Sequence, residues 1–404
     1  MTLDLPNERP LPSSSPEERV EYFRRKKLAH RNLARAWDKL LVAVMDPDPC
    51  SLTLVYGPTG GGKTTLAHRL KDYLESLDGK LSRSPGTIPV ALIEAVASGN
   101  SGFDWRDYYI RALQALDEPL IHKKLDPDFM LHTARAYQTH LRSKRPSVTD
   151  LRRGLESCLR QRSPRAFLID EAQHLKKIAS GKRLIDQMDT IKSLANMTGV
   201  KHVLFGTYEL FGLTNLSAQL NRRTVEIHFP RYRFDDPKDM EEFILFLESL
   251  EKHLPMPEPS LLSENPLAVR FIYTRSAGCP GILKDWMTRA LGEAIREGSK
   301  KVDISHYERT AIPDVQLARI AREIKEGENQ INPDRSEEIE SLLGVASTDR
   351  GGPFQQASIK SPEKRSRNPR PGTRKPARDP IGLGGAEIPM EKSDDRPITR
   401  PESA

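Results

Sequence analysis

The chain has 404 residues, which is enough to bury a sizeable core without disulfides or structural metals. Lysine and arginine number 63 against 56 acidic residues, so the net charge of +7 modestly favours a polyanionic partner. The three cysteines, Cys50, Cys158 and Cys279, are far apart and have no zinc-ligand spacing, which predicts free thiols in a reducing compartment. No apolar run approaches the roughly 18 residues of a membrane span, so we expect a cytoplasmic protein without a membrane partner.

The N-terminal 50 residues are predicted to hold a flexible leader followed by a helical segment. Residues 1–15 are rich in Pro and Ser, and apolar residues recur at helical spacing from Glu17 to Met45. We therefore expect an amphipathic helical segment before the core.

Residues 51–234 show the alternation of an α/β domain. Short apolar runs in this region are typical of buried parallel strands. Helical stretches at residues 64–77 and 183–197 separate some of these runs. The five expected strands cover residues 52–56, 89–96, 166–169, 200–205 and 224–229. The sequence thus predicts a five-stranded parallel sheet covered by helices.

The remainder of the chain is predicted to contain no strand. Residues 235–310 read as a small helical lid, broken by prolines near 255–259 and by the turn at 278–281. Residues 311–345 are expected to form a helical extension. Residues 346–404 are basic, rich in Pro and poor in large apolar side chains, so we predict a disordered tail.

A phosphate-binding loop follows the first predicted strand. The pattern G-x-x-x-x-G-K-[ST] begins at Gly57 and ends at Thr64, between an apolar run and a helix. Its glycines let backbone N–H groups point at phosphate oxygens, while Lys63 neutralises the β and γ phosphates and Thr64 ligates Mg²⁺. The residues expected to bind the nucleotide here are Gly57, Pro58, Thr59, Gly60, Gly61, Gly62, Lys63, Thr64 and Thr65.

A second motif about a hundred residues later completes the predicted site. The run Ala166–Ile169 delivers Asp170 and Glu171 to the carboxyl edge of the sheet, as a Walker B strand does. Asp170 is placed to hold Mg²⁺, and Glu171 is placed to orient and deprotonate the attacking water. This pair of acids indicates hydrolysis of ATP as well as binding.

Three further positions are candidate sensors of the nucleotide. Thr207 ends the predicted strand at 200–205 and brings a hydroxyl to the same edge, as a sensor-1 residue would. Arg222 or Arg223 is a candidate arginine finger that acts on a neighbouring subunit's nucleotide, and the sequence does not choose between them. Lys284 follows the turn in the lid and is a candidate sensor-2 residue, although lysine offers only a point charge.

The chain resembles the TniB/TnsC group of AAA+ transposition ATPases, whose role is similar to that of MuB. The resemblance spans about residues 17–310. Beyond the two Walker motifs, it is carried by the strings at 101–105, 170–175, 189–195, 206–210 and 219–223. It implies an AAA+ P-loop NTPase fold and an ATP-dependent regulator that forms helical filaments on double-stranded DNA.

The partners implied by this resemblance are a target-selecting protein, which in some systems is a CRISPR-associated complex, and a DDE transposase. DNA binding along the phosphate backbone would be steeply dependent on salt. The candidate basic contacts are Arg106, Arg111, Lys176, Lys177, Lys182 and Arg183. Two other classes of protein stay open: a nucleotide-gated signalling scaffold of the STAND type, and a replication-type loader of a clamp or helicase.

Overall fold

The computed structural model describes part of the chain, and every described residue lies in the first of two compact units, Met1–Asp334 and Arg335–Ala404. The described ranges are 14–46, 52–78, 86–97, 103–121, 146–176, 182–211 and 224–331. Cys50, Arg222, Arg223 and the predicted tail at 346–404 fall outside them. Within these ranges, no helix has the length and apolar character needed to cross a membrane.

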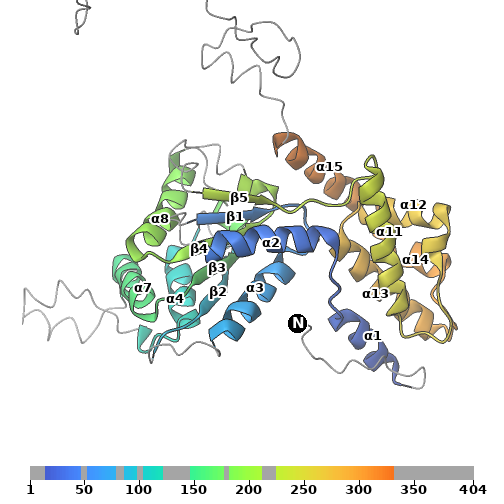
Figure 1. Ribbon diagram of the computed structural model, residues 1–404, viewed down its shortest axis with the longest axis horizontal. Coiled ribbons are helices and arrows are strands. Elements are labelled where there is room, and N and C mark those ends of the chain that lie inside the picture. The colour runs from blue at the N-terminus through green and yellow to red at the C-terminus, as the bar shows by residue number, and fades with distance from the viewer. Residues whose placement is uncertain are drawn as a thin grey trace, which may run out of the picture. The chain divides into compact units, whose positions relative to one another are not determined.

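A five-stranded parallel sheet forms the centre of the α/β part, which confirms the predicted fold class (Figure 1). The strands are β1 (Leu52–Tyr56), β2 (Val90–Glu94), β3 (Ala166–Asp170), β4 (Lys201–Gly206) and β5 (Thr224–His228). Their order is β2-β3-β4-β1-β5, with β1 between β4 and β5. Because all strands run in one direction, the residues that follow β1, β3 and β4 leave the sheet at the same edge.

Helices cover both faces of this sheet because successive residues of its strands face opposite sides. Helices α2 (Arg31–Met45) and α3 (Lys63–Asp78) bury Val55 and Phe205 on one face. The other face carries α4 (Trp105–Ala115), α7 (Val148–Arg162) and α8 (Lys182–Thr198), which enclose Leu54 and Phe167. The edge strand β5 is less covered than expected, since only its Ile227 is buried.

The predicted N-terminal helical segment is divided into two helices that join different cores. Helix α1 (Pro16–Arg25) buries Phe23 in the helical part, whereas α2 packs on the sheet. His30 precedes α2 and caps it, because its Nδ1 accepts a hydrogen bond from the Leu33 N–H at 3.4 Å. Apolar spacing continues across the break, so the sequence pattern alone does not reveal it.

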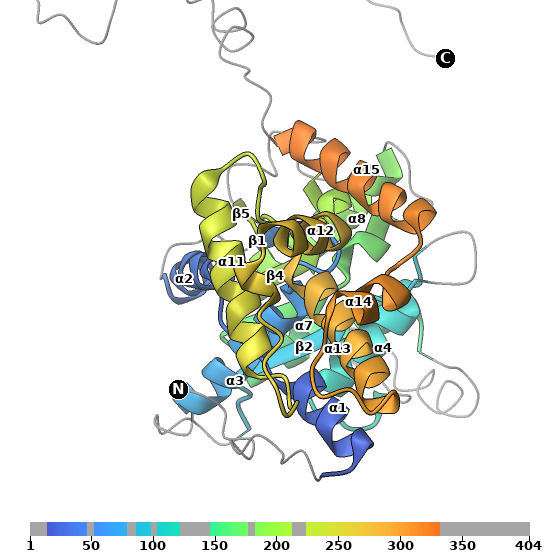
Figure 2. The same ribbon diagram turned by 90° about the vertical axis from the view of Figure 1, so that its right-hand side faces the viewer.

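The helical part is built from α11 (Pro237–Lys252), α12 (Pro266–Ser276), α13 (Pro280–Arg296) and α14 (Ile304–Thr310) (Figure 2). Trp286 is buried in its core and donates from Nε1 to the Tyr307 carbonyl at 3.1 Å. Helix α15 (Asp314–Ile331) follows and contacts the short turn Tyr208–Leu210 that succeeds β4. The C-terminal helix of the described chain therefore returns to the α/β part.

Candidate nucleotide-binding site

The loop between β1 and α3 has a backbone that requires glycine at defined positions. Gly60 and Gly62 adopt φ values of +73° and +103°, which side chains disfavour. A Cβ on Gly57 would lie 2.1 Å from the Phe229 carbonyl oxygen, so only glycine allows this approach. Helix α3 begins at Lys63, and the first N–H groups of a helix have no intrahelical partner. These groups form an anion-binding end beside the loop.

Lys63 is a buried cation at this end of the loop. Its side chain is 9% exposed, and Nζ donates to the carbonyls of Gly57 and Pro58 at 3.1 and 2.7 Å. No carboxylate of the described residues lies within ion-pair distance of Nζ, and burial lowers the pKa of Lys63. A buried ammonium without an adjacent counter-charge fits an anionic ligand such as a phosphate group.

The two Walker B acids lie at the end of β3, where Asp170 is the last residue of the strand and Glu171 follows it. Asp170 is 8% exposed, and its Oδ1 accepts a hydrogen bond from the Glu171 N–H at 2.9 Å. Glu171 has φ +52°, in the left-handed region, so the chain turns sharply off the strand at this residue. The Glu171 side chain is 40% exposed, which leaves its carboxylate open to water.

Thr207 leaves the neighbouring strand β4 and lies beside these acids. Its hydroxyl makes no capping hydrogen bond to the turn Tyr208–Leu210, while its N–H donates to Gln173 Oε1 at 3.2 Å. Gln173 Nε2 in turn donates to Glu171 Oε2. Gln173 thereby joins two predicted site residues, a role that local sequence patterns did not indicate.

The residues expected to hold Mg²⁺ are suited to a site completed by phosphate and water. Thr64 is exposed in the first turn of α3, and Asp170 lies at the carboxyl edge of the sheet. The described residues contain no cluster of three or more His, Cys, Asp or Glu that could hold a metal ion. Mg²⁺ commonly uses one or two protein ligands together with waters and substrate phosphates, which fits this pair.

The start of α13 rests directly on the glycine loop. The Gly281 N–H donates to the Gly60 carbonyl at 2.7 Å, and a Cβ on Gly281 would lie 2.5 Å from that oxygen. Lys284, one turn further along, points elsewhere: its Nζ donates to the Arg24 carbonyl at the end of α1, at 2.8 Å. The structure brings the turn of the predicted lid to the loop, and it brings the Lys284 ammonium to α1.

Helix α15 adds contacts that the sequence analysis did not identify. Glu323 accepts a hydrogen bond from the Thr59 hydroxyl at 3.4 Å, and Glu328 pairs with Arg231 at 2.9 Å. Gly327 packs on the Tyr208 ring so closely that a Cβ would lie 2.2 Å from it. A glycine inside a helix weakens the helix and often marks a place where another segment approaches its backbone closely. Gly327 is therefore the residue from which this contact could have been predicted.

Only two of the candidate DNA contacts have described side chains. Arg106 donates to the Pro146 carbonyl at 2.6 Å, and Arg111 pairs with Asp107 at 2.6 Å while remaining 45% exposed. The side chains of Lys176, Lys177, Lys182 and Arg183 lie outside the described part of the chain, as do Arg222 and Arg223. Both described arginines thus have partners within their own domain.

The contact between α13 and the loop can be tested with a pair of glycine substitutions. Gly60 and Gly199 have similar left-handed φ values, +73° and +70°, so alanine at either position costs roughly 1–2 kcal/mol of backbone strain. Only Gly60→Ala also brings a Cβ to 2.6 Å from Ile282, which should add about 1–3 kcal/mol. Denaturant unfolding of both variants measures the difference. Equal losses would show that the Gly60 and Ile282 contact does not form in solution.

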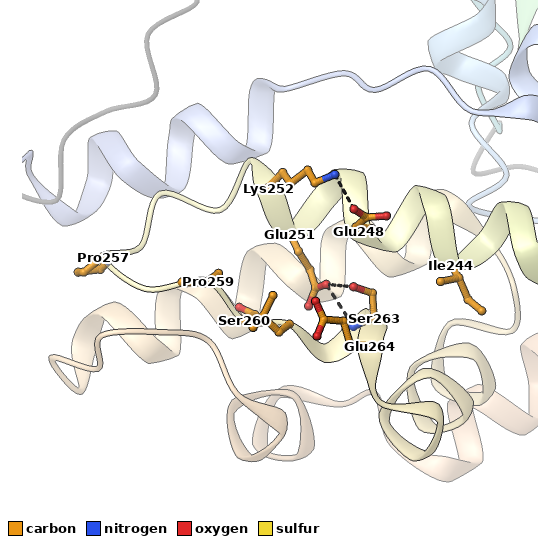
Figure 3. A pocket seen from close by; sticks show the side chains of 10 residues that line it. Ile244, Glu248, Glu251, Lys252, Pro257, Pro259, Ser260, Ser263 and Glu264 are labelled. Atoms are coloured by element: carbon orange, nitrogen blue, oxygen red, sulfur yellow. Dashed lines mark hydrogen bonds and ion pairs between the residues drawn. The ribbon is translucent and has the colours of Figure 1, made fainter.

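A separate hollow of about 660 Å³ lies in the helical part, beside α11 (Figure 3). Its Glu251 carboxylate accepts hydrogen bonds from the Leu262 and Ser263 N–H groups at 2.8 and 3.2 Å, so it holds the following loop in place. None of its lining residues comes from the glycine loop or from the ends of β3 and β4. This hollow is therefore distinct from the candidate nucleotide site.

Comparisons with known proteins agree with the fold. Residues 46–214 match the family model described as AAA domain. No curated protein sequence matches the chain. Similar solved structures include the Walker-type ATPase of Pyrococcus abyssi, at 18% identity, with 81% of this chain and 88% of that chain covered and a TM-score of 0.41. The ORC2 protein of Aeropyrum pernix has 15% identity, coverages of 76% and 70%, and a TM-score of 0.43.

A Drosophila ORC structure bound to DNA has 15% identity, coverages of 86% and 85%, and a TM-score of 0.44. Similarity at this level says nothing about substrate or partner. The family match lies on the part of the chain that holds β1 to β4, the glycine loop and the Walker B acids. The chain has an α/β fold built on a five-stranded parallel sheet, and its residues 46–214 match the AAA domain model.

Proposed function

We propose that this protein is a Mg²⁺-dependent ATPase that regulates DNA transposition by assembling on double-stranded DNA. The observation that carries the ATPase assignment is the buried Lys63 ammonium, which follows a glycine loop at the edge where β3 and β4 also end. No carboxylate of the described residues lies within ion-pair distance of it. A triphosphate supplies the missing negative charge, and Glu171 supplies a base open to water.

Each residue of the site has a distinct role in this proposal. The N–H groups from Gly60 to Thr65 and the Lys63 ammonium hold the β and γ phosphates. Thr64 and Asp170 hold Mg²⁺, which when bound neutralises charge on the phosphate oxygens. Glu171 accepts the proton of the attacking water, and the Thr207 hydroxyl orients that water or the γ phosphate.

A neighbouring subunit completes the site in this proposal. Arg222 or Arg223 serves as the arginine finger, because a planar guanidinium suits the charge that spreads over the transferred phosphoryl group. Residues 235–310 act as the lid on the domain at 51–234. To serve as sensor 2, the Lys284 ammonium would have to leave the Arg24 carbonyl that it contacts in the structure.

The assignment to transposition is supported by the sequence resemblance to the TniB/TnsC group. In this role the protein binds DNA mostly without sequence preference and links a target-selecting protein to a DDE transposase. The chain itself carries out no strand transfer. Its net charge of +7 agrees with a polyanionic partner.

DNA binding should require ATP and weaken steeply with salt. If about six to ten phosphates are contacted, raising the salt from about 50 to about 200 mM should reduce affinity by about 10³-fold or more. Fluorescence anisotropy with duplexes of two unrelated sequences, with and without ATP and Mg²⁺, measures both effects. A protein whose DNA affinity is the same with and without ATP would lack the proposed coupling.

Electron microscopy with ATP and duplex DNA separates the proposal from its alternatives. Helical filaments on DNA support the transposition regulator. Small closed rings instead favour a clamp or helicase loader, and the absence of any assembly favours a nucleotide-gated scaffold. The ATPase assignment is tested independently of assembly, by phosphate release with and without a Mg²⁺ chelator.

A further inference from the structure

We propose that Gln173 is a positioning residue that holds the Glu171 carboxylate and ties it to the loop after β4. This inference rests on the proposed ATPase function. Gln173 Nε2 donates to Glu171 Oε2, and Gln173 Oε1 accepts from the Thr207 N–H at 3.2 Å. One amide therefore connects the predicted base with the predicted phosphate sensor, although the two residues follow different strands.

The two contacts define which way the amide faces. The Thr207 N–H can only donate, and an ionised Glu171 carboxylate can only accept, so the amide oxygen must face Thr207 and the amide nitrogen must face Glu171. Glutamate at position 173 would place one carboxylate against another. An aliphatic side chain of similar volume would make neither hydrogen bond. Glutamine is thus matched to both of its partners.

Gly206 provides the space that this arrangement needs. Gln173 is 9% exposed, and a Cβ added to Gly206 would lie 2.8 Å from Gln173 Oε1 and 3.2 Å from the Gln173 nitrogen. Gly206 is the last residue of β4 and stands opposite Tyr56, which directly precedes the glycine loop. The amide is consequently enclosed at the edge of the sheet where the candidate nucleotide site lies.

Glu171 needs such a partner because its own backbone does not hold its side chain. The residue lies in the left-handed region at φ +52°, between the end of β3 and the turn Ala172–Lys176. Its side chain is 40% exposed, and the His174 Nε2 lies 4.0 Å from its Oε2. Without the amide, the carboxylate would sample several rotamers, and few of them would face the attacking water.

The hydrogen bond from the Thr207 N–H to the Gln173 amide links the loop after β4 to Glu171. Thr207 precedes the turn Tyr208–Leu210, so a γ phosphate that contacts the Thr207 hydroxyl also shifts the Thr207 N–H. Gln173 transmits this shift to Glu171 through a single rigid amide. The position of the Glu171 carboxylate is thereby coupled to the position of the loop after β4.

The decisive variant is Gln173→Met, which keeps the volume of the side chain and removes both hydrogen bonds. We expect kcat for ATP hydrolysis to fall about 10- to 100-fold, since misplacement of a catalytic group by about 1 Å has an effect of this size. The affinity for a non-hydrolysable ATP analogue should change less than about threefold. Gln187→Met is the matched control, because the buried Gln187 amide oxygen has no hydrogen-bond partner among the described residues.

Two further measurements separate positioning from a merely structural role. In a Glu171→Gln background, Gln173→Met should cause no additional loss of kcat, because residues that act as one unit are not additive. The second measurement uses Gln173→Glu, which keeps the length of the side chain but cannot donate a hydrogen bond to the ionised Glu171 carboxylate. Its kcat should fall as that of Gln173→Met does.

The outcomes distinguish this inference from the proposed function. If wild-type protein hydrolyses ATP and Gln173→Met leaves kcat unchanged, the positioning role is wrong. The same conclusion follows if the loss is as large in the Glu171→Gln background as in wild type. If the wild-type protein releases no phosphate above the level of Glu171→Gln, the ATPase proposal itself fails.

Discussion

Replacing Lys63 with alanine should weaken the binding of ATP by about 10- to 100-fold. The Lys63 ammonium is buried at the start of α3, and its hydrogen bonds within the described part of the chain go to the Gly57 and Pro58 carbonyls, so its charge is available to a phosphate. Hydrogen bonds to charged groups contribute about 1.5–3 kcal/mol, which corresponds to this range of affinity. Titration calorimetry with a non-hydrolysable ATP analogue measures the change.

Lys71→Ala is the control for this experiment. Lys71 lies on the same helix but is partly exposed and pairs with Glu75 at 2.6 Å. Such a surface ion pair contributes little to the free energy of unfolding. The Lys71 variant should bind nucleotide as wild type does and should gain the same thermal stabilisation from the analogue. Binding by Lys63→Ala at wild-type affinity would show that the nucleotide does not occupy this loop.

Replacing Glu171 with glutamine should reduce ATP hydrolysis by about 10²- to 10⁴-fold, the usual contribution of a general base. The amide has nearly the same shape but cannot accept the proton of water. Nucleotide binding should persist, because Lys63 and the loop N–H groups are intact. Assemblies formed with ATP should therefore accumulate and outlast those of the wild type, which phosphate release and sedimentation together would detect.

Glu209→Gln makes the same chemical change on a nearby exposed acid in the turn after β4. It should leave both hydrolysis and assembly unchanged. Wild-type turnover by Glu171→Gln would mean that another group serves as the base. Loss of nucleotide binding in that variant would instead indicate that Glu171 is needed to form the site.

The sheet was predictable because buried parallel strands are continuous apolar runs with clear boundaries. The run Leu52–Tyr56 became β1 with the same bounds, and Ala166–Ile169 became β3 with Asp170 added at its end. The break between α1 and α2 was not predictable from periodicity. It depends on the aromatic and polar partners that surround His30 in the folded chain, including Phe246 at 5.1 Å between ring centroids.

The site was predictable only where one segment carries a whole motif. The glycine loop and the Walker B acids have local spacing rules, whereas contacts between distant segments have none. The hydrogen bond from Gly281 to Gly60 joins residues more than 200 positions apart. The orientation of Lys284 toward Arg24 likewise depends on where α1 packs, which no local pattern records. Such contacts require the tertiary structure.

The Gly281 to Gly60 hydrogen bond also has a thermodynamic consequence. Coupling free energies are reciprocal: if nucleotide in the loop changes the docking equilibrium of α13 by some factor, docking of α13 changes the affinity for nucleotide by the same factor. A partner that binds α11 to α14 and changes the docking of α13 would then change the affinity for ATP without contacting the loop. The fraction of protein with bound nucleotide would therefore depend on which partner is bound to the helical part.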